Sequence, residues 1–183
     1  MWKTALNWGI TEYWDGIMLK LFDTMNGLRF MDLMDVYSET NRLNAEDQYD
    51  YLDINEAFIR VEKDFYSYLS QVFFTTPGAI YAVWEERGRY ICALRLEPFK
   101  DGYLLEGLET APEYRKMGYA SNLIRQVLNE MECPVYSHVH KKNKASMLTH
   151  KACGFSKYLD YAVYIDGSVN RNSLTLRWVK VNN

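Results

Sequence analysis

Residues 103–139 constrain the fold of this chain most strongly, because their pattern predicts a strand, a basic glycine turn, a helix and a second strand. The first strand-like run is Tyr103–Thr110, and the second is Val135–Val139, directly after Pro134. The apolar residues between them recur with helical spacing and form one face: Ala120, Leu123, Ile124, Val127, Leu128 and Met131. Because one helix joins the two strands, we expect a right-handed crossover with the strands parallel.

The turn that enters this helix has the features of a phosphate-binding site. The first N–H groups of a helix lack partners within it, and the helix dipole favours an anion there. Gly118 permits close approach of a ligand, and two basic side chains add positive charge. The segment therefore predicts a site for the pyrophosphate of a nucleotide-bearing cofactor. Its residues are Arg115, Lys116, Met117, Gly118, Tyr119 and Ala120.

Two segments within residues 111–155 resemble the GNAT superfamily of acyl-CoA N-acyltransferases. The family's helix-entry pattern is Gln or Arg, two residues, Gly, one residue, then Gly or Ala; it is met by Arg115, Gly118 and Ala120. A second family pattern, N-x-x-A-x-x-L-Y-x-x-x-G-F, is matched in register by Asn143, Gly154 and Phe155. The chain departs from that pattern where Ser146 replaces the Ala, Thr149 the Leu and His150 the Tyr.

The resemblance implies that acetyl-CoA binds in a wedge where the parallel strands Tyr103–Thr110 and Val135–His140 diverge. Backbone groups of Leu108, Glu109 and Thr110 would then pair with the pantetheine arm. Asn143, a favoured helix N-cap, would also contact the cofactor, and Ser146 faces the same way.

Gly107 lies inside the first of these strands, and an interior glycine often marks a β-bulge. A bulge would turn an N–H group towards the thioester oxygen and stabilise the tetrahedral oxyanion. The alternative is that Gly107 only eases a tight packing contact.

The element order and the resemblance together predict an α+β fold of three layers within a single domain, residues 1–183. Helices cover both faces of a mixed, twisted, mostly antiparallel sheet of about seven strands. We expect further strands at Ile17–Phe22, Ala79–Trp84, Tyr90–Leu96, Lys157–Ile165 and Leu174–Val181. We expect further helices at about Leu28–Asn44, Ile54–Val72 and Lys144–Cys153.

All three histidines of the chain fall in the segment that should line the wedge. An amine with a pKa of ~10.4 is almost wholly protonated at neutral pH, so a base assists its attack on a thioester. By resemblance His150 takes the position of the usual acid tyrosine, and His138 takes a position where some relatives carry a base glutamate. We therefore expect His150 to protonate the leaving thiolate and His138 to be the base, with Glu106 as the alternative base and His140 a wall residue.

Other readings of these side chains stay open. His150 could be a helix-surface residue while a tyrosine elsewhere serves as acid, and Glu106 could be a solvated or salt-bridged carboxylate. His138, His140, His150 and Cys153 have the residue types of a zinc site, but no CxxC pair supports one, so we expect no metal.

The acceptor pocket of this family is usually shaped by the first two helices. Between Asp35 and Asp64 the chain carries nine acidic and three basic side chains. A negative rim attracts cations, so we expect a primary amine of a small molecule or peptide, leaning towards a cationic one. The alternative is that these carboxylates form only a solvated helix face.

Charge and cysteine content limit the partners and the cellular location that we expect. A net charge of −3 argues against general binding to nucleic acid or to an anionic membrane. Three dispersed cysteines and a non-signal-like N-terminus favour the cytoplasm. In residues 1–15, Trp2, Trp8 and Trp14 would pack at the domain edge or form a homodimer contact.

The sequence thus predicts an N-acetyltransferase that moves an acetyl group from acetyl-CoA to an amine by direct attack in a ternary complex. The alternative is a non-catalytic acyl-CoA-binding module or sensor. A dinucleotide-binding Rossmann domain is disfavoured, because no G-x-G-x-x-G follows an early strand.

Overall fold

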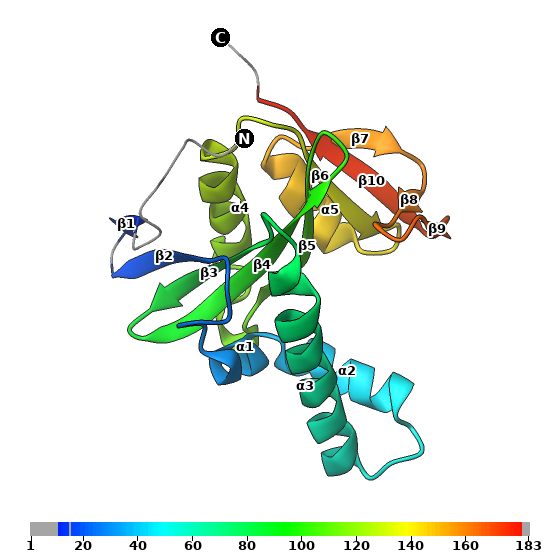
Figure 1. The fold of residues 1–183 in the computed structure, drawn as a ribbon. Coiled ribbons are helices and arrows are strands. Elements are labelled where there is room, and N and C mark those ends of the chain that lie inside the picture. The colour runs from blue at the N-terminus through cyan, green and yellow to red at the C-terminus, as the bar shows by residue number, and fades with distance from the viewer. Residues whose placement is uncertain (1–10, 15, 181–183) are drawn as a thin grey trace.

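A twisted sheet of eight strands runs through the centre of the computed structural model, which describes residues 11–14 and 16–180 (Figure 1). The strand order is β1-β2-β3-β4-β5-β6-β10-β7, and a separate pair is formed by β8 and β9. The bounds are β1 Thr11–Trp14, β2 Ile17–Phe22, β3 Ile80–Glu86, β4 Arg89–Phe99, β5 Gly102–Thr110, β6 Val135–His140, β7 Ser156–Leu159, β8 Ala162–Val163, β9 Val169–Asn170 and β10 Ser173–Trp178.

The neighbours β5 and β6 are parallel, and every other pair in the sheet is antiparallel. The crossover from β5 to β6 passes through α4 (Tyr119–Asn129). The predicted strand, turn, helix and strand unit is therefore confirmed. Trp2 and Trp8 lie outside the described residues, so the dimer contact expected from them stays a prediction.

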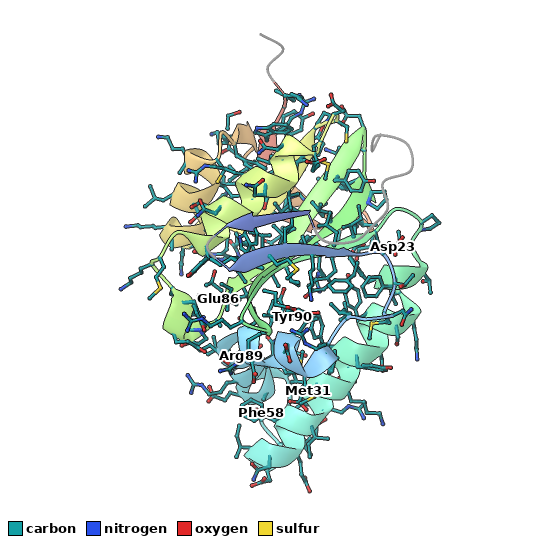
Figure 2. The ribbon with its side chains drawn as sticks, turned by 90° about the vertical axis from the view of Figure 1, so that its left-hand side faces the viewer. Asp23, Met31, Phe58, Glu86, Arg89 and Tyr90 are labelled. Atoms are coloured by element: carbon teal, nitrogen blue, oxygen red, sulfur yellow. The ribbon has the colours of Figure 1, made fainter. Side chains whose placement is uncertain are left out.

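Helices cover both faces of the sheet, as the apolar patterns predict (Figure 1). On one face α1 (Phe30–Val36) and α3 (Ile54–Gln71) pack on β3 and β4, and α2 (Ser38–Gln48) lies against α3. The apolar stripe of α4 packs on the other face, with α5 (Lys144–Ala152) beside it. Figure 2 shows Arg89 and Tyr90 of β4 next to α1, which carries Met31. None of the helices in the described chain is both long and apolar enough to cross a membrane.

The expectation of one helix over Leu28–Asn44 was wrong. The chain forms α1 and α2 with a break at Tyr37, whose dihedrals are φ −92° and ψ 13°. Tyr37 is buried, and its hydroxyl donates a hydrogen bond of 2.5 Å to the carbonyl of Gly107 in β5. A tertiary contact at this position therefore coincides with the break, and helix propensity alone does not reveal it.

The expectation of one strand over Lys157–Ile165 was also wrong. β7 ends at Leu159, and β8 pairs with β9 instead of with the main sheet. Thr175 in β10 donates a hydrogen bond of 2.7 Å to the carbonyl of Tyr161, within the segment that separates β7 from β8. The alternation of polar and apolar residues predicts which side chains of a strand are buried. It does not predict which strand pairs with it, so the pattern is compatible with this bend.

Gly102 permits the close approach of β5 to the segment that precedes β6. The N–H of Tyr103 donates a hydrogen bond of 3.0 Å to the carbonyl of Pro134, and a Cβ added to Gly102 would lie 1.9 Å from that carbonyl oxygen. The two parallel strands are thus joined at their starts through a position that has no room for a side chain.

We expect Gly102→Ala to lower the free energy of unfolding by about 3 kcal/mol, because the backbone of Pro134 must move. Urea denaturation measures this change. The matched control is Gly167→Ala, at φ 81° with open surroundings, which should cost about 1 kcal/mol from backbone strain. Equal losses for the two variants would contradict the close approach.

Candidate active site

A β-bulge interrupts β5 at Gly107, as the interior glycine predicts. Arg95 of β4 pairs with Glu106 and Ala93 pairs with Glu109, so two residues of β5 oppose one residue of β4. Gly107 has a φ of +57°, in the left-handed region that glycine adopts readily. A Cβ at this position would lie 3.2 Å from Nε of Arg95. The side chain of Arg95 therefore occupies the space beside the bulge that a Cβ would need.

The strands β5 and β6 diverge at the same level. Their residue pairing covers only Tyr103–Leu105 with Val135–Ser137, although β5 continues to Thr110 and β6 to His140. Beyond Ser137, β6 stays paired with β10 on its other side. The expected wedge between the two strands is thus present.

A cavity of about 480 Å³ occupies this wedge and reaches helices on both faces of the sheet. Residues of α2 and α3 line one part of it, and residues of α5 line another. The cavity brings together six of the residues predicted from the sequence: Glu106, Leu108, Glu109, His138, Ser146 and His150.

The start of α4 lies outside this cavity and is open to solvent. Gly118 is the N-cap residue, with a φ of 87°, and no side chain caps the helix. Lys116, Met117 and Gly118 are exposed, and a Cβ added to Gly118 would meet nothing within 4 Å. The helix mouth is therefore not blocked by the described part of the chain, and its first-turn N–H groups have no side-chain partner.

Arg115 does not point freely into that mouth. Its guanidinium forms an ion pair with Glu39 of α2 and lies 3.7 Å from the carboxylate of Glu109. Its Nε donates a hydrogen bond of 3.1 Å to the carbonyl of Thr110. Arg115 thus links α2 to the end of β5, and its charge is shared with two carboxylates. This differs from the sequence expectation, which took its charge to be available to the phosphate.

Met117 and Tyr119 contribute to a second cavity of about 600 Å³ beside α4. Trp84, Cys153 and Trp178 also line it. Part of the predicted phosphate turn therefore borders this second cavity, whereas the wedge cavity is lined by His138 and His150.

His150 is buried, with 1% of its surface exposed, so the alternative of a helix-surface residue was wrong. Its Nδ1 lies 2.8 Å from the carbonyl oxygen of Ser146, which can only accept, so Nδ1 carries the hydrogen. Its Nε2 is buried without a partner among the described residues. Burial lowers the pKa of His150, partly offset by the bond to Ser146, so the neutral form has a bare lone pair at Nε2.

The short helix that carries His150 is capped as predicted. Oδ1 of Asn143 accepts a hydrogen bond of 3.0 Å from the N–H of Ser146. The cap fixes the start of α5 and therefore the placement of the histidine on its last turn.

Both ring nitrogens of His138 lie close to polar atoms of the protein, and Nε2 carries the hydrogen because it faces a carbonyl oxygen. Nε2 lies 3.0 Å from the carbonyl oxygen of Val163, and Nδ1 lies 3.2 Å from the hydroxyl of Thr175. Burial lowers the pKa of His138, and the bond to Val163 opposes that effect. His140 is exposed, and its Nδ1 accepts a hydrogen bond of 3.1 Å from the N–H of Lys142.

Glu106 faces Arg95 across the β4–β5 ladder, but no ion pair forms between them. Burial raises the pKa of Glu106, Arg95 acts in the opposite direction, and Glu97 raises the pKa further. The salt-bridged alternative was therefore wrong, since no described cation lies within 4.0 Å of this carboxylate. The result is a partly buried carboxylate that protonates at a higher pH than an ordinary glutamate.

Sequence reasoning missed Arg95 and Tyr37, which both line the cavity. Tyr81 donates a hydrogen bond of 2.9 Å to the hydroxyl of Tyr37, and burial raises the pKa of Tyr81 to about 12. The available signal for Arg95 was a single charge inside the apolar strand run Tyr90–Leu96. No comparable signal distinguished Tyr37 from the other tyrosines.

Only part of the acidic segment between Asp35 and Asp64 lies at the wedge cavity. Asp64 lines the cavity, whereas Asp47, Asp50 and Asp53 do not. In the described ranges no three His, Cys, Asp or Glu side chains lie close enough to hold a metal ion, so the alternative zinc site is not formed there.

Comparison with known proteins gives the class of this chain. Residues 32–155 match the Acetyltransferase (GNAT) family. The match covers more than half of the chain, and the chain belongs to this family. The fold and the matched family together identify an acyltransferase of the N-acetyltransferase type.

Solved structures with the same fold are distant in sequence. An acetyltransferase from Streptococcus agalactiae has a TM-score of 0.58 at 15% identity, with 91% of this chain and 100% of that chain covered. The PaiA N-acetyltransferase from Thermoplasma acidophilum, in complex with coenzyme A, has a TM-score of 0.57 at 12% identity and coverages of 88% and 99%. A mutant spermidine N-acetyltransferase from Vibrio cholerae has a TM-score of 0.55 at 16% identity and coverages of 89% and 93%. No curated protein sequence matches significantly.

Proposed function

We propose that this protein transfers the acetyl group of acetyl-CoA to a primary amine by direct attack within a ternary complex. The observation that carries this proposal is the cavity at the divergence of β5 and β6, which reaches helices on both faces of the sheet. Two substrates can then approach one point from opposite sides, as a direct transfer requires.

The cofactor would enter from the side of α4 and α5. The open N–H groups of residues 116–120 bind the diphosphate, with Lys116 exposed beside them. The pantetheine arm runs along Leu108, Glu109 and Thr110, where β5 has left β6. Asn143 and Ser146 at the start of α5 border the arm, and the thioester lies at the Gly107 bulge.

The reaction forms one C–N bond and breaks one C–S bond. The amine nitrogen attacks the thioester carbon, the carbonyl electrons move to oxygen, and the tetrahedral intermediate collapses with loss of the thiolate. The proton lost by the amine passes to a base, and the thiolate takes up a proton to give free CoA. Backbone N–H groups at the bulge would stabilise the oxyanion.

Glu106 is the base in this proposal and His138 a positioning residue. The Nε2 of His138 donates to the carbonyl of Val163, which fixes the ring against β8, whereas the carboxylate of Glu106 lines the cavity without an ion-pair partner among the described residues. A raised pKa makes Glu106 a stronger base than an ordinary carboxylate. His150 protonates the thiolate from Nε2 in the molecules whose ring is charged; the lowered pKa makes that charged ring a stronger acid than an ordinary imidazolium and reduces its share at neutral pH.

The acceptor is an amine that approaches between α2 and α3, and a cationic amine fits the carboxylates of Asp64, Glu106 and Glu109 on the cavity wall. We also propose a cytoplasmic location, which the free thiols of Cys92, Cys133 and Cys153 support.

Thermal unfolding with and without acetyl-CoA, followed by a panel of amines read out as free thiol, tests the proposed function. Acetyl-CoA should raise the Tm by mass action, and at least one amine should release thiol. A non-catalytic acyl-CoA sensor would show the first effect without the second. The absence of any stabilisation would contradict both functions.

Gly118→Glu should abolish the stabilisation by acetyl-CoA, because it places a negative charge and bulk at the diphosphate site. The matched control is Gly167→Glu, since Gly167 also has a positive φ of 81° and open surroundings. The control should retain the full rise in Tm. Normal stabilisation of the Gly118 variant would remove the helix mouth from the cofactor site.

His150→Phe should lower kcat by about 10²-fold or more while leaving the affinity for acetyl-CoA nearly unchanged. Phenylalanine fills the buried volume beside Phe155 but has no ring nitrogen. Isothermal titration gives the affinity, and steady-state thiol release gives kcat. An unchanged kcat would exclude His150 from proton transfer.

The pH dependence of kcat/KM should reflect the ionisation of Glu106. Glu106 works as a base only when it is ionised, so its contribution is lost as the pH drops through its pKa, which gives the acid limb of the profile. Because burial raises the pKa, the fall should occur at a higher pH than for an ordinary glutamate. Glu106→Gln should lower the rate and remove this acid limb. A limb that persists in the variant would belong to another group.

A further inference from the structure

Arg95 is a half-buried cation with a buried Nε that has no partner among the described residues. Its guanidinium lines the wedge cavity and lies over the rings of Phe65 and Tyr68, at 5.8 and 5.1 Å from the ring centroids. Among the described residues, none forms a hydrogen bond or an ion pair with it, and its Nε is fully buried without a partner.

A guanidinium in this position is costly unless something pairs with it. Arginine stays protonated in proteins, so it cannot avoid the cost by losing its charge. Contacts with ring faces offset part of the desolvation but leave the N–H donors unused. The donors on the cavity wall are therefore available to an acceptor that enters the cavity.

The side chains around Arg95 are already engaged elsewhere. Tyr37 donates to the carbonyl of Gly107, and Tyr81 donates to Tyr37. Tyr68 donates a hydrogen bond of 2.5 Å to Glu97. Glu106, the opposite residue in the ladder, keeps a raised pKa and forms no ion pair with Arg95. The protein thus surrounds the guanidinium with groups that do not neutralise it by direct contact.

We propose that Arg95 binds a carboxylate of the acceptor, so that the acceptor belongs to the class of free amino acids. This inference rests on the proposed function and specifies its substrate. The planar fork of a guanidinium matches the two oxygens of a carboxylate in a bidentate pair.

The position of Arg95 also limits the distance between the two groups of the acceptor. The guanidinium lies against the Gly107 bulge, with Nε, Cζ and Nη2 within 3.2–3.3 Å of the place that a Cβ would take. Because the thioester lies at this bulge in the proposed reaction, the attacked amine and the bound carboxylate are only a few atoms apart. An α-amino acid has that spacing.

The charges of the cavity fit such a zwitterion. Glu106 provides negative charge for the ammonium group, Asp64 and Glu109 add charge that Arg60 and Arg115 partly offset, and Arg95 is the cationic side chain on the wall. A polyamine without a carboxylate would leave Arg95 unpaired. In the transfer step the neutral amine nitrogen of the amino acid takes the acetyl group, its proton passes to Glu106, and CoA leaves as the thiol.

Matched acceptors test this inference on the unaltered protein. Each common amino acid is compared with its amide and with the amine that remains after decarboxylation, at saturating acetyl-CoA. For the side chains that are accepted, the free acid should have a kcat/KM at least about tenfold higher than either analogue. The amine of the amide is more often neutral, so chemical reactivity alone would favour the amide. Equal or higher values for the analogues would overturn the inference.

Variants of Arg95 test whether this residue causes the preference for the free acid. Arg95→Met should raise the KM for the free acid and abolish the preference over the decarboxylated amine, while stabilisation by acetyl-CoA persists. Arg95→Lys should restore part of the preference, because it keeps the charge without the fork. A fall in kcat for both kinds of acceptor, with unchanged preference, would make Arg95 an oxyanion-stabilising residue and contradict carboxylate binding.

Arg177→Met is the matched control. Arg177 also lies in a strand, has a buried Nε without a partner among the described residues and stacks on two tyrosine rings, but it is outside the cavity. Its replacement should leave acceptor preference unchanged. If Arg95→Met does not unfold cooperatively, the comparison of acceptors on the unaltered protein decides alone.

The possible failures are distinguishable. Thiol release with amines but with none of the amino acids would overturn this inference and leave the proposed transferase intact. A protein that neither binds acetyl-CoA nor releases thiol with any acceptor would overturn both.

Discussion

The bulge in β5 is the constraint on which the rest of the site depends. At Gly107 two residues of β5 face one residue of β4, and at the same level β5 loses its pairing with β6. If β5 and β6 stayed paired beyond this point, their backbone hydrogen bonds would leave no opening between the two strands. The interruption leaves backbone groups of β5 available to a ligand and opens a passage between the faces. Glycine adopts the observed φ of +57° without strain, and a Cβ at this position would crowd the side chain of Arg95.

The surrounding structure holds this interruption from both sides. Tyr37, at the break between α1 and α2, donates its hydroxyl hydrogen to the carbonyl of Gly107, and Tyr81 donates to Tyr37 in turn. Arg115 ties α2 to the end of β5 through Glu39 and the carbonyl of Thr110. α2 and the break that precedes it are thus linked directly to β5, the strand that carries the bulge.

The regular parts of this fold were predictable because they depend on local patterns. The stripe of α4, the glycine at its mouth and the Asn143 cap are each specified within a few residues. The bulge was predictable from a glycine inside a strand. The break at Tyr37 and the departure of β8 from the sheet were not, because each coincides with a contact that links distant segments. Arg95 was missed for a related reason: a charge inside a strand can be interpreted only once the neighbouring strands and α3 show that no described residue forms a hydrogen bond or an ion pair with it.

The central claim is that coenzyme A enters the sheet at the divergence of β5 and β6. A crystal structure of the protein with bound CoA tests it most directly. We predict the diphosphate at residues 116–120 and the sulfur beside Gly107, between the two strands. CoA bound instead in the second hollow beside α4, against Trp84 and Trp178, with the wedge empty, would contradict the account.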